Sequence, residues 1–204
     1  MKIPKLMLIT DGKLETNSIT LNKVFSACHN GLPAIQLREK TIEARRLWEL
    51  ANMLRKITLD HGIFFSINDR VDIALSVDAD GVHLSEGGLS PQIPKKLKPS
   101  LIVGVSVHSL EMGRRAEQEG ADYVLFGPIF QTPSKIAFGK PQGLENLKEI
   151  AHNLSIPVLA VGGITPVEIN CCINAGAYGV AAIGAFMQSE DIKMTINDFL
   201  REFK

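Results

Sequence analysis

The chain has 204 residues, and its 22 lysines and arginines balance 22 aspartates and glutamates, so the net charge at pH 7 is zero. This balance excludes a general electrostatic attraction to nucleic acid or to an anionic membrane, and no apolar run approaches the length of a membrane span. The length suits one sizeable core, and we expect a single domain over residues 1–204.

The amino-terminal apolar run leads straight to Asp11 without a small-residue cleavage site. We therefore interpret it as a first strand and not as a signal peptide. The three cysteines, Cys28 and the adjacent pair Cys171 and Cys172, offer neither a disulfide framework nor the spacing of a zinc site. A reducing, cytoplasmic setting is expected.

Eight short apolar runs, each rich in Val, Ile, Leu or Phe, recur along the chain. They cover residues 6–11, 34–38, 64–68, 81–84, 102–107, 123–130, 157–164 and 179–186. Several are nearly continuous, which is typical of parallel strands buried on both faces. Amphipathic stretches at helical spacing lie between them, for example at 41–60, 110–119 and 144–153.

A weak internal echo supports this alternation. Segments 78–83, 120–125 and 176–181 each end a helix and begin a strand, at intervals of about 40 to 60 residues. Eight strands alternating with helices at roughly 25 residues per unit predict a closed (β/α)8 TIM barrel with parallel strands. A doubly wound open sheet is the alternative, but residues 10–13 lack the glycine-rich turn that a dinucleotide-binding sheet requires.

The second predicted strand ends in polar residues at the position where such barrels form their active sites. Strand alternation sends Gln36, Arg38 and Lys40 to one side and Glu39 to the other. Polar side chains in a barrel mouth are costly unless they meet a ligand or each other, and Arg38 with Lys40 suits a diphosphate. A salt-bridge cluster of Arg38, Glu39 and Lys40 on the rim is the alternative.

The third predicted strand ends in Asn68 and Asp69. An amide at this place could bind a heterocycle, and a carboxylate could bind Mg²⁺ or an amino group. The alternative is an Asx turn in which Asp69 caps a helix that starts at Val71.

The stretch 126–135, after the sixth predicted strand, places the hydroxyls of Thr132 and Ser134 beside the ammonium group of Lys135. Hydroxyls, backbone N–H groups and a point cation on one turn are suited to phosphate. The alternative is an ordinary strand-to-helix turn, bent at Pro133 and capped by Ser134.

Glycines end the last two predicted strands. Gly162, Gly163 and Gly184 leave backbone amides bare at adjacent strand ends, which indicates a phosphate site. Together with the cationic region, this second region suggests a condensation between two phosphorylated ligands, or the release of diphosphate.

His83, at the fourth strand end, is interpreted as a packed histidine. No serine or cysteine lies in a recognisable nucleophile elbow.

In this order the motifs resemble the thiamine phosphate synthase family. They are Gln-Leu-Arg-Glu-Lys, Ile-Asn-Asp, Asp-Gly-Val-His-Leu, Gly-Val-Ser, Gly-Pro-Ile-Phe with Thr-Pro-Ser-Lys, and Gly-Gly-Ile-Thr, and they span nearly the whole chain. The resemblance implies a (β/α)8 barrel of thiamine biosynthesis. Such an enzyme joins a hydroxymethylpyrimidine diphosphate to a thiazole phosphate with Mg²⁺ as cofactor, and releases diphosphate.

The resemblance also implies roles for individual residues. The catalytic residues would be Arg38, Lys40 and Lys135. The pyrimidine diphosphate would be held by Gln36, Arg38, Lys40, Asn68, Ser106 and Lys135, and the thiazole phosphate by Thr132, Ser134, Gly163, Ile183 and Gly184. Asp69 would bind magnesium. The partners expected are these phosphorylated small molecules and a second copy of the chain in a homodimer, with no nucleic acid and no membrane.

The chain departs from the family pattern after the fourth strand. Gly88 stands where the family usually has a second magnesium carboxylate, and Glu86, two residues away, is the candidate replacement. This departure raises two alternatives: a TenI-like thiazole tautomerase, and a non-catalytic relative that binds thiazole phosphate. Tautomerases usually have a histidine after the glycine that follows strand six. Here that position is Pro128, as in the synthases.

Overall fold

The structure is a computed structural model and describes residues 3–132 and 140–203. In this part of the chain eight parallel strands pair in sequence order, and β8 pairs with β1 to close a barrel. This confirms the predicted (β/α)8 fold. The strands are β1 (Leu6–Ile9), β2 (Ala34–Leu37), β3 (Phe64–Asn68), β4 (Gly81–Leu84), β5 (Ile102–Val107), β6 (Tyr123–Phe126), β7 (Val158–Val161) and β8 (Gly179–Ala182).

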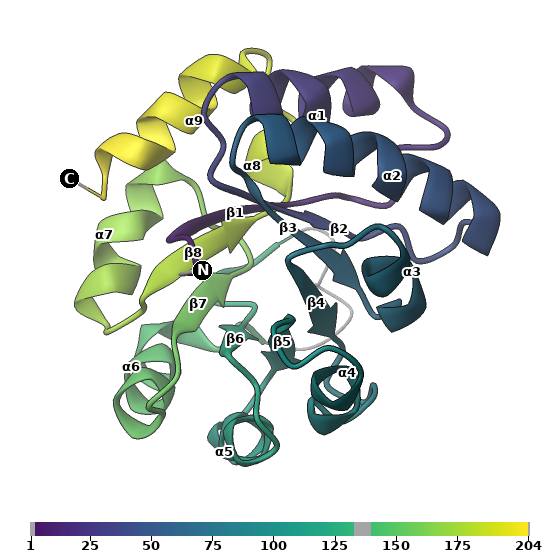
Figure 1. The fold of residues 1–204 in the computed structure, drawn as a ribbon. Coiled ribbons are helices and arrows are strands. Elements are labelled where there is room, and N and C mark those ends of the chain that lie inside the picture. Colours follow the sequence, from purple (N-terminus) through teal and green to yellow (C-terminus); the bar gives the residue numbers. More distant parts are fainter. Residues whose placement is uncertain (1–2, 133–139, 204) are drawn as a thin grey trace.

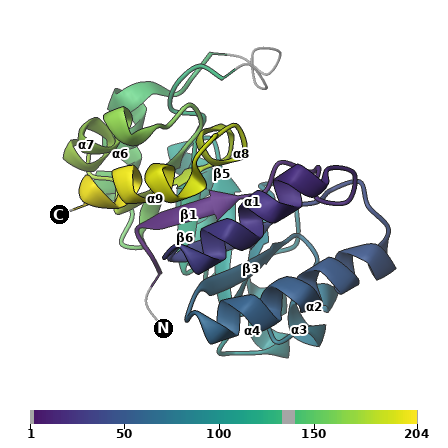
Figure 2. The same ribbon diagram turned by 90° about the horizontal axis from the view of Figure 1, so that it is seen from above.

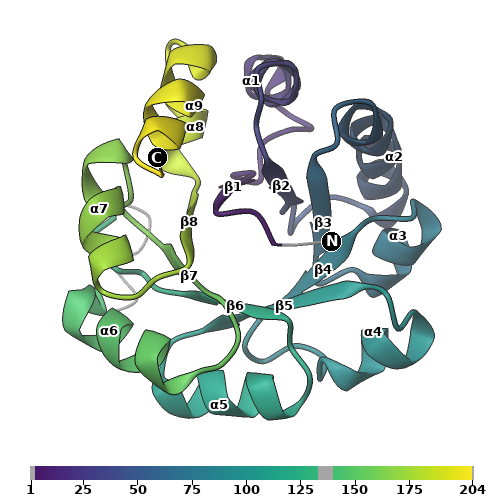
Figure 3. The same cartoon turned by 60° about the vertical axis from the view of Figure 1, so that its left-hand side comes forward.

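Helices surround the barrel on the outside, as Figure 1 and Figure 3 show. They are α1 (Ser18–His29), α2 (Ala44–Asp60), α3 (Val71–Ser76), α4 (Gln92–Leu97), α5 (Leu110–Gln118), α6 (Gly143–Asn153), α7 (Pro166–Asn174), α8 (Gly184–Met187) and α9 (Ile192–Arg201). The first helix, α1, contacts both α2 and α9, so the ring of helices closes where the barrel closes (Figure 2).

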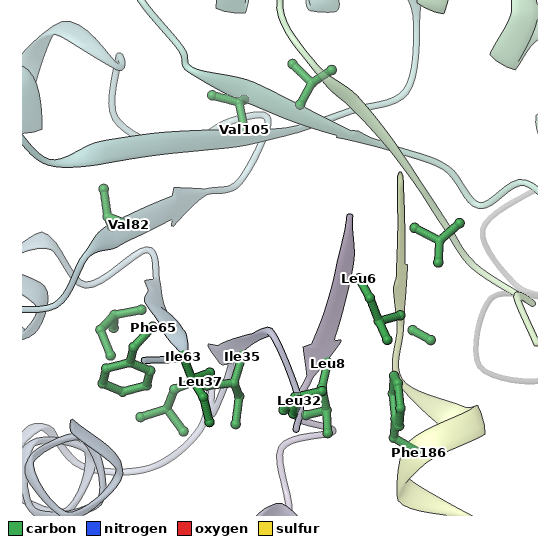
Figure 4. Close-up of a cluster of buried hydrophobic side chains, with 14 of the residues drawn as sticks. Leu6, Leu8, Leu32, Ile35, Leu37, Ile63, Phe65, Val82, Val105 and Phe186 are labelled. Atoms are coloured by element: carbon green, nitrogen blue, oxygen red, sulfur yellow. The ribbon is translucent and has the colours of Figure 1, made fainter. Parts of the chain in front are cut away.

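Alternation along the strands separates two cores. Residues such as Met7, Phe64, Tyr123 and Leu159 point into the barrel and pack on one another. Their neighbours along the strands point outward and pack under the helices, as Figure 4 shows for Leu8, Ile35, Phe65 and Val82, and Phe186 of α8 belongs to the same cluster. Successive side chains of a strand face opposite sides, and most strands carry apolar residues on both, so the sequence runs are nearly continuous.

The predicted strands are correct in number, and the last three are shorter than expected. The sixth ends at Phe126 and not at 130, because Pro128 has no N–H group to continue the ladder. The seventh ends at Val161, because Gly162 and Gly163 have φ angles of 97° and 70° that turn the chain away. The eighth ends at Ala182, where the chain enters the short helix α8.

Two of the three segments of the internal echo contain an aspartate that ties strands together at the amino end of the barrel, whereas the third has Tyr178 at this position. Asp80, just before β4, accepts a hydrogen bond from the Phe65 N–H at 2.9 Å and pairs with Arg55. Asp122, just before β6, accepts one from the Val103 N–H at 2.6 Å and pairs with Lys95. The amino end of a (β/α)8 barrel serves stability, so these bonds leave the opposite end for function.

None of the described helices is both long enough and apolar enough to cross a membrane. The three cysteines are free thiols. Burial raises the pKa of Cys28 to about 11 and that of Cys172 to about 12, so both remain protonated and unreactive at neutral pH.

Candidate active site

The end of β2 brings the predicted cations to the barrel mouth. Gln36 is buried in the barrel, with its amide nitrogen 3.9 Å from the Met7 sulfur. The backbone N–H of Arg38 donates to the Thr10 hydroxyl at 2.8 Å, which fixes the point where the chain leaves the strand. Arg38 is half-buried and Lys40 is exposed.

Glu39 has a different task from its two neighbours. Its carboxylate is buried and accepts hydrogen bonds from the N–H groups of Gly12 at 3.2 Å and Leu14 at 3.1 Å. Burial raises its pKa above the ordinary value of 4.5. Within residues 3–132 and 140–203 it forms no ion pair with Arg38 or Lys40, so the structure does not support the alternative of a rim cluster.

Asp69 follows β3 in a left-handed conformation, with a φ of 58° that is uncommon for an aspartate. Its carboxylate accepts from the Ser85 N–H at 2.7 Å, the Ser85 hydroxyl at 2.5 Å and the Asn68 amide at 2.7 Å. Helix α3 instead has Arg70 at its N-cap, with no side-chain capping bond. The interpretation of Asp69 as a helix cap is therefore wrong.

His83 lies inside the barrel among the polar strand ends. Its Nδ1 is 3.2 Å from the Tyr123 hydroxyl and its Nε2 is 2.9 Å from the Ser106 hydroxyl. Burial lowers its pKa to about 3, so the ring is neutral at physiological pH and packed as expected. The charges of Arg38 and Lys40 lower this pKa further, and that of Asp69 raises it.

Strands β2 and β3 are hydrogen-bonded neighbours, with Leu37 paired to Ile67, so their ends lie side by side in the mouth. A pocket of about 210 Å³ lies between them, lined by Glu39, Lys40, Ile42, Leu47, Asn68, Asp69 and Arg70. The structure thus brings together Lys40 from one strand end and the Asn68 amide and Asp69 carboxylate from the next, whereas Arg38 does not line this pocket.

The β4–α4 segment holds the candidate second metal ligand, and Glu86 binds a neighbouring loop. Its carboxylate accepts from the His108 N–H at 3.1 Å and lies 3.0 Å from His108 Nδ1. A side chain at Gly88 would instead lie beside Asp69, since a Cβ there would be 3.5 Å from Asp69 Oδ1. Among the residues that the structure describes, no three His, Cys, Asp or Glu side chains form a group that could hold a metal ion.

The opposite side of the mouth is built from backbone. The Ile129 and Phe130 N–H groups donate to the carbonyls of Val161 and Gly162, at 2.9 and 3.0 Å. These bonds draw the segment after β6 so close that a Cβ at Gly163 would lie 2.7 Å from the Phe130 Cβ. Thr132, half-buried, follows this segment, whereas Ser134 and Lys135 lie outside the described residues.

The N–H groups of Gly163 and Gly184 donate no hydrogen bond to another described residue. Ile183 is the N-cap residue of α8, and its carbonyl accepts from the Phe186 and Met187 N–H groups. The end of this helix is held by Lys23, whose ammonium group donates to the Met187 carbonyl at 2.9 Å. The two backbone amides that were predicted to bind phosphate therefore lie after β7 and β8 and have no described protein acceptor.

Three residues of the site were not found from the sequence: Thr10, Ser85 and Tyr123. Thr10 and Ser85 each follow an apolar strand directly, and that position was the available signal. Tyr123 begins a strand and gave no signal, because only the closed barrel brings it to His83.

Comparison with known proteins agrees with this arrangement. The model of a family described as thiamine monophosphate synthase matches residues 6–186. The chain belongs to this family. A thiamine-phosphate synthase from Moorella thermoacetica is 43% identical over 188 residues, which cover 92% of this chain and 90% of the relative.

Two archaeal members of the thiamine monophosphate synthase family are also similar. A thiamine-phosphate synthase from Pyrococcus horikoshii is 39% identical over 189 residues, covering 93% of this chain and 89% of the relative. The solved structure of a thiamine phosphate pyrophosphorylase from Pyrococcus furiosus superposes with a TM-score of 0.87 at 36% identity. It covers 97% of this chain and 94% of the solved one. The family relationship therefore extends over the whole barrel.

Proposed function

We propose that the protein acts as a thiamine phosphate synthase, a transferase that joins hydroxymethylpyrimidine diphosphate to hydroxyethylthiazole phosphate. The observation that carries this proposal is that the adjacent ends of β2 and β3 carry Arg38 and Lys40 on one and Asn68 and Asp69 on the other, and that Lys40, Asn68 and Asp69 line one pocket. Two cations beside a carboxylate suit a diphosphate and the divalent ion that accompanies it. The family relationship supports the same activity.

In this reaction the bond between the pyrimidine methylene and the diphosphate breaks, and its electron pair leaves on the diphosphate oxygen. The thiazole nitrogen then forms the new bond to the methylene with its lone pair. Arg38 and Lys40, with Lys135, would stabilise the charge that develops on the departing diphosphate. Gln36, Asn68 and Ser106 would help to hold the pyrimidine diphosphate, and no protein nucleophile is needed.

The residues at the end of β3 fit a magnesium ion that is coordinated largely by oxygens of the bound substrate and by water. The Asp69 carboxylate accepts three hydrogen bonds, which leaves about one of its four lone-pair positions open. Mg²⁺ accepts one protein carboxylate together with substrate oxygens and waters. When bound, the ion would neutralise charge on the diphosphate. Glu86 is the proposed second ligand, and it would have to release His108 to serve.

The acceptor phosphate would bind on the opposite side of the mouth. The Gly163 and Gly184 N–H groups are directed to no described protein acceptor, and Ile183 and Thr132 flank them. Backbone amides and hydroxyls without charge suit a phosphate that stays bound during the reaction. Ser134 would join this group. The two proposed phosphate sites thus differ in chemistry. The site for the diphosphate is cationic, and the site for the acceptor phosphate consists of uncharged amides and hydroxyls.

The tautomerase alternative requires a proton-transfer residue at position 128. Pro128 has no titratable group, and its carbonyl accepts from the Gln142 N–H at 2.7 Å. The synthase is therefore the better-supported activity. A measurement of turnover distinguishes the synthase from the non-catalytic alternative, because a protein that only binds its ligand forms no product.

The test incubates purified protein with both synthase substrates and Mg²⁺ and follows thiamine phosphate and diphosphate by chromatography. We expect stoichiometric formation of both products, loss of turnover with a chelator, and a loss of about a hundredfold or more in Arg38→Ala. Arg201→Ala, on the exposed face of α9, is the matched control. Binding of both substrates without product would reject the synthase, and conversion of a thiazole carboxylate tautomer in a parallel run would favour the tautomerase.

A further inference from the structure

Tyr123, His83 and Ser106 form a chain of hydrogen bonds that runs from inside the barrel to its mouth. The two distances are 3.2 Å from the Tyr123 hydroxyl to His83 Nδ1 and 2.9 Å from His83 Nε2 to the Ser106 hydroxyl. Tyr123 and His83 are 0% and 1% exposed, whereas Ser106 is half-buried. Of the three, only Ser106 is therefore placed to meet a ligand.

The strand register makes room for this series of hydrogen bonds. Gly104 of β5 pairs with Tyr123 of β6 on one side and with His83 of β4 on the other. A Cβ at Gly104 would overlap the Tyr123 ring and its hydroxyl. The phenol occupies the space of this missing side chain, and its hydroxyl reaches across β5 to the imidazole two strands away.

The charge around Ser106 determines the direction of these hydrogen bonds. A neutral imidazole has one donor nitrogen and one acceptor nitrogen. Arg38 and Lys40 follow β2 at the same end of the barrel and make the mouth suitable for an anion, which offers acceptors only. Ser106 can donate its own proton to such a ligand when its oxygen accepts from His83 Nε2–H. Nδ1 then accepts from the Tyr123 hydroxyl.

We infer that Tyr123 and His83 are positioning residues, which hold the Ser106 hydroxyl as a hydrogen-bond donor toward the bound diphosphate substrate. The inference rests on the proposed function, because that function places the substrate against Ser106. The opposite tautomer, with the proton on Nδ1, would take the Ser106 proton for itself and present only lone pairs to the anion. The tautomer of His83 therefore decides whether Ser106 can act as this donor.

The first experiment measures this tautomer without substrate. Protein with ¹⁵N-labelled histidine is studied by NMR at pH 7, and the His83 signals are assigned by their absence in His83→Gln. We expect a neutral ring protonated on Nε2. Protonation on Nδ1, or on both nitrogens, overturns the inference whatever the protein's activity. Absence of turnover in the unaltered protein counts against the proposed function alone.

The second experiment is a double-mutant cycle. Tyr123→Phe removes one hydroxyl and should lower kcat about threefold to tenfold, with the KM for thiazole phosphate unchanged. In a Ser106→Ala background the same substitution should have no further effect, because both act through one hydroxyl. Additive effects, or a kcat unchanged in Tyr123→Phe, overturn the inference.

The matched control is Tyr178→Phe, since Tyr178 is the second tyrosine of the chain and its hydroxyl donates to the Ile3 carbonyl at 2.8 Å, outside the mouth. Its kcat should equal that of the unaltered protein. If Tyr123→Phe does not fold, which thermal unfolding would report, the tautomer measurement on the unaltered protein still decides.

Discussion

Ser85 binds both oxygens of the Asp69 carboxylate, with its backbone N–H to Oδ1 at 2.7 Å and its hydroxyl to Oδ2 at 2.5 Å. These bonds join the ends of β3 and β4 and hold the carboxylate in one orientation. A carboxylate that is already oriented loses less entropy when it binds a metal ion. Ser85 therefore supports the proposed magnesium site although it is not itself a proposed ligand.

Replacing Ser85 by alanine removes one of these bonds and leaves the backbone bond intact. We expect the Mg²⁺ concentration for half-maximal turnover to rise about tenfold, as is usual when a partner of a metal ligand is lost. Titrating Mg²⁺ in the synthase assay measures this. Ser76→Ala, at the far end of α3, is the control, because Ser76 donates only to the Ile73 carbonyl. An unchanged Mg²⁺ requirement in Ser85→Ala would show that Asp69 needs no such support.

Gly88 offers the reverse experiment. A Cβ at this position would lie 3.5 Å from Asp69 Oδ1 and 3.0 Å from the Ser85 carbonyl, so a side chain needs only a small adjustment. We expect Gly88→Asp to lower the Mg²⁺ requirement about tenfold, because the ion would gain a second carboxylate. Gly88→Asn, of the same shape without the charge, is the control. Equal Mg²⁺ requirements in the two variants would contradict a metal site next to residue 88.

Glu39 should make stability depend on pH in an unusual direction. Its folded-state pKa lies above the ordinary value of 4.5, so above that pH the folded protein holds this proton more tightly than the unfolded chain does. The contribution of Glu39 to the free energy of unfolding therefore falls as pH rises from about 4.5 through the raised pKa.

Denaturant unfolding of Glu39→Gln against the unaltered protein tests this sign. The difference between unaltered and variant stability should become smaller, or reverse, between pH 4 and pH 7. A difference that grows with pH would show that the bonds from Gly12 and Leu14 to the charged carboxylate outweigh its burial.

His83 should act in the opposite direction. Its folded-state pKa of about 3 lies below its ordinary value of 6.5, so in this interval the unfolded chain binds the extra proton. Its stabilising contribution is complete above pH 6.5 and is lost as pH falls toward 3. We expect the unaltered protein to lose roughly 3 kcal/mol more than His83→Gln between pH 7 and pH 4.

The sequence predicts the fold well because each strand is an apolar run flanked by polar residues. It also places Arg38, Lys40, Asn68 and Asp69 at the mouth, since the carboxyl ends of parallel strands meet there. It could not give the partner of Glu39, which lies 25 residues away at Leu14, nor the partner of His83, which lies 40 residues away at Tyr123. Such contacts are created by barrel closure and register, and a strand run alone carries no information on them.

The division of work within Leu37–Lys40 has a consequence for protein engineering. Arg38 and Lys40 are proposed to bind the ligand, while Glu39 holds the backbone of the β1–α1 loop. A library that randomises all three positions would change the loop anchor together with the proposed ligand contacts, so effects on folding and on specificity would be mixed. Keeping glutamate at 39 and varying only 38 and 40 would explore other anionic substrates on an intact scaffold.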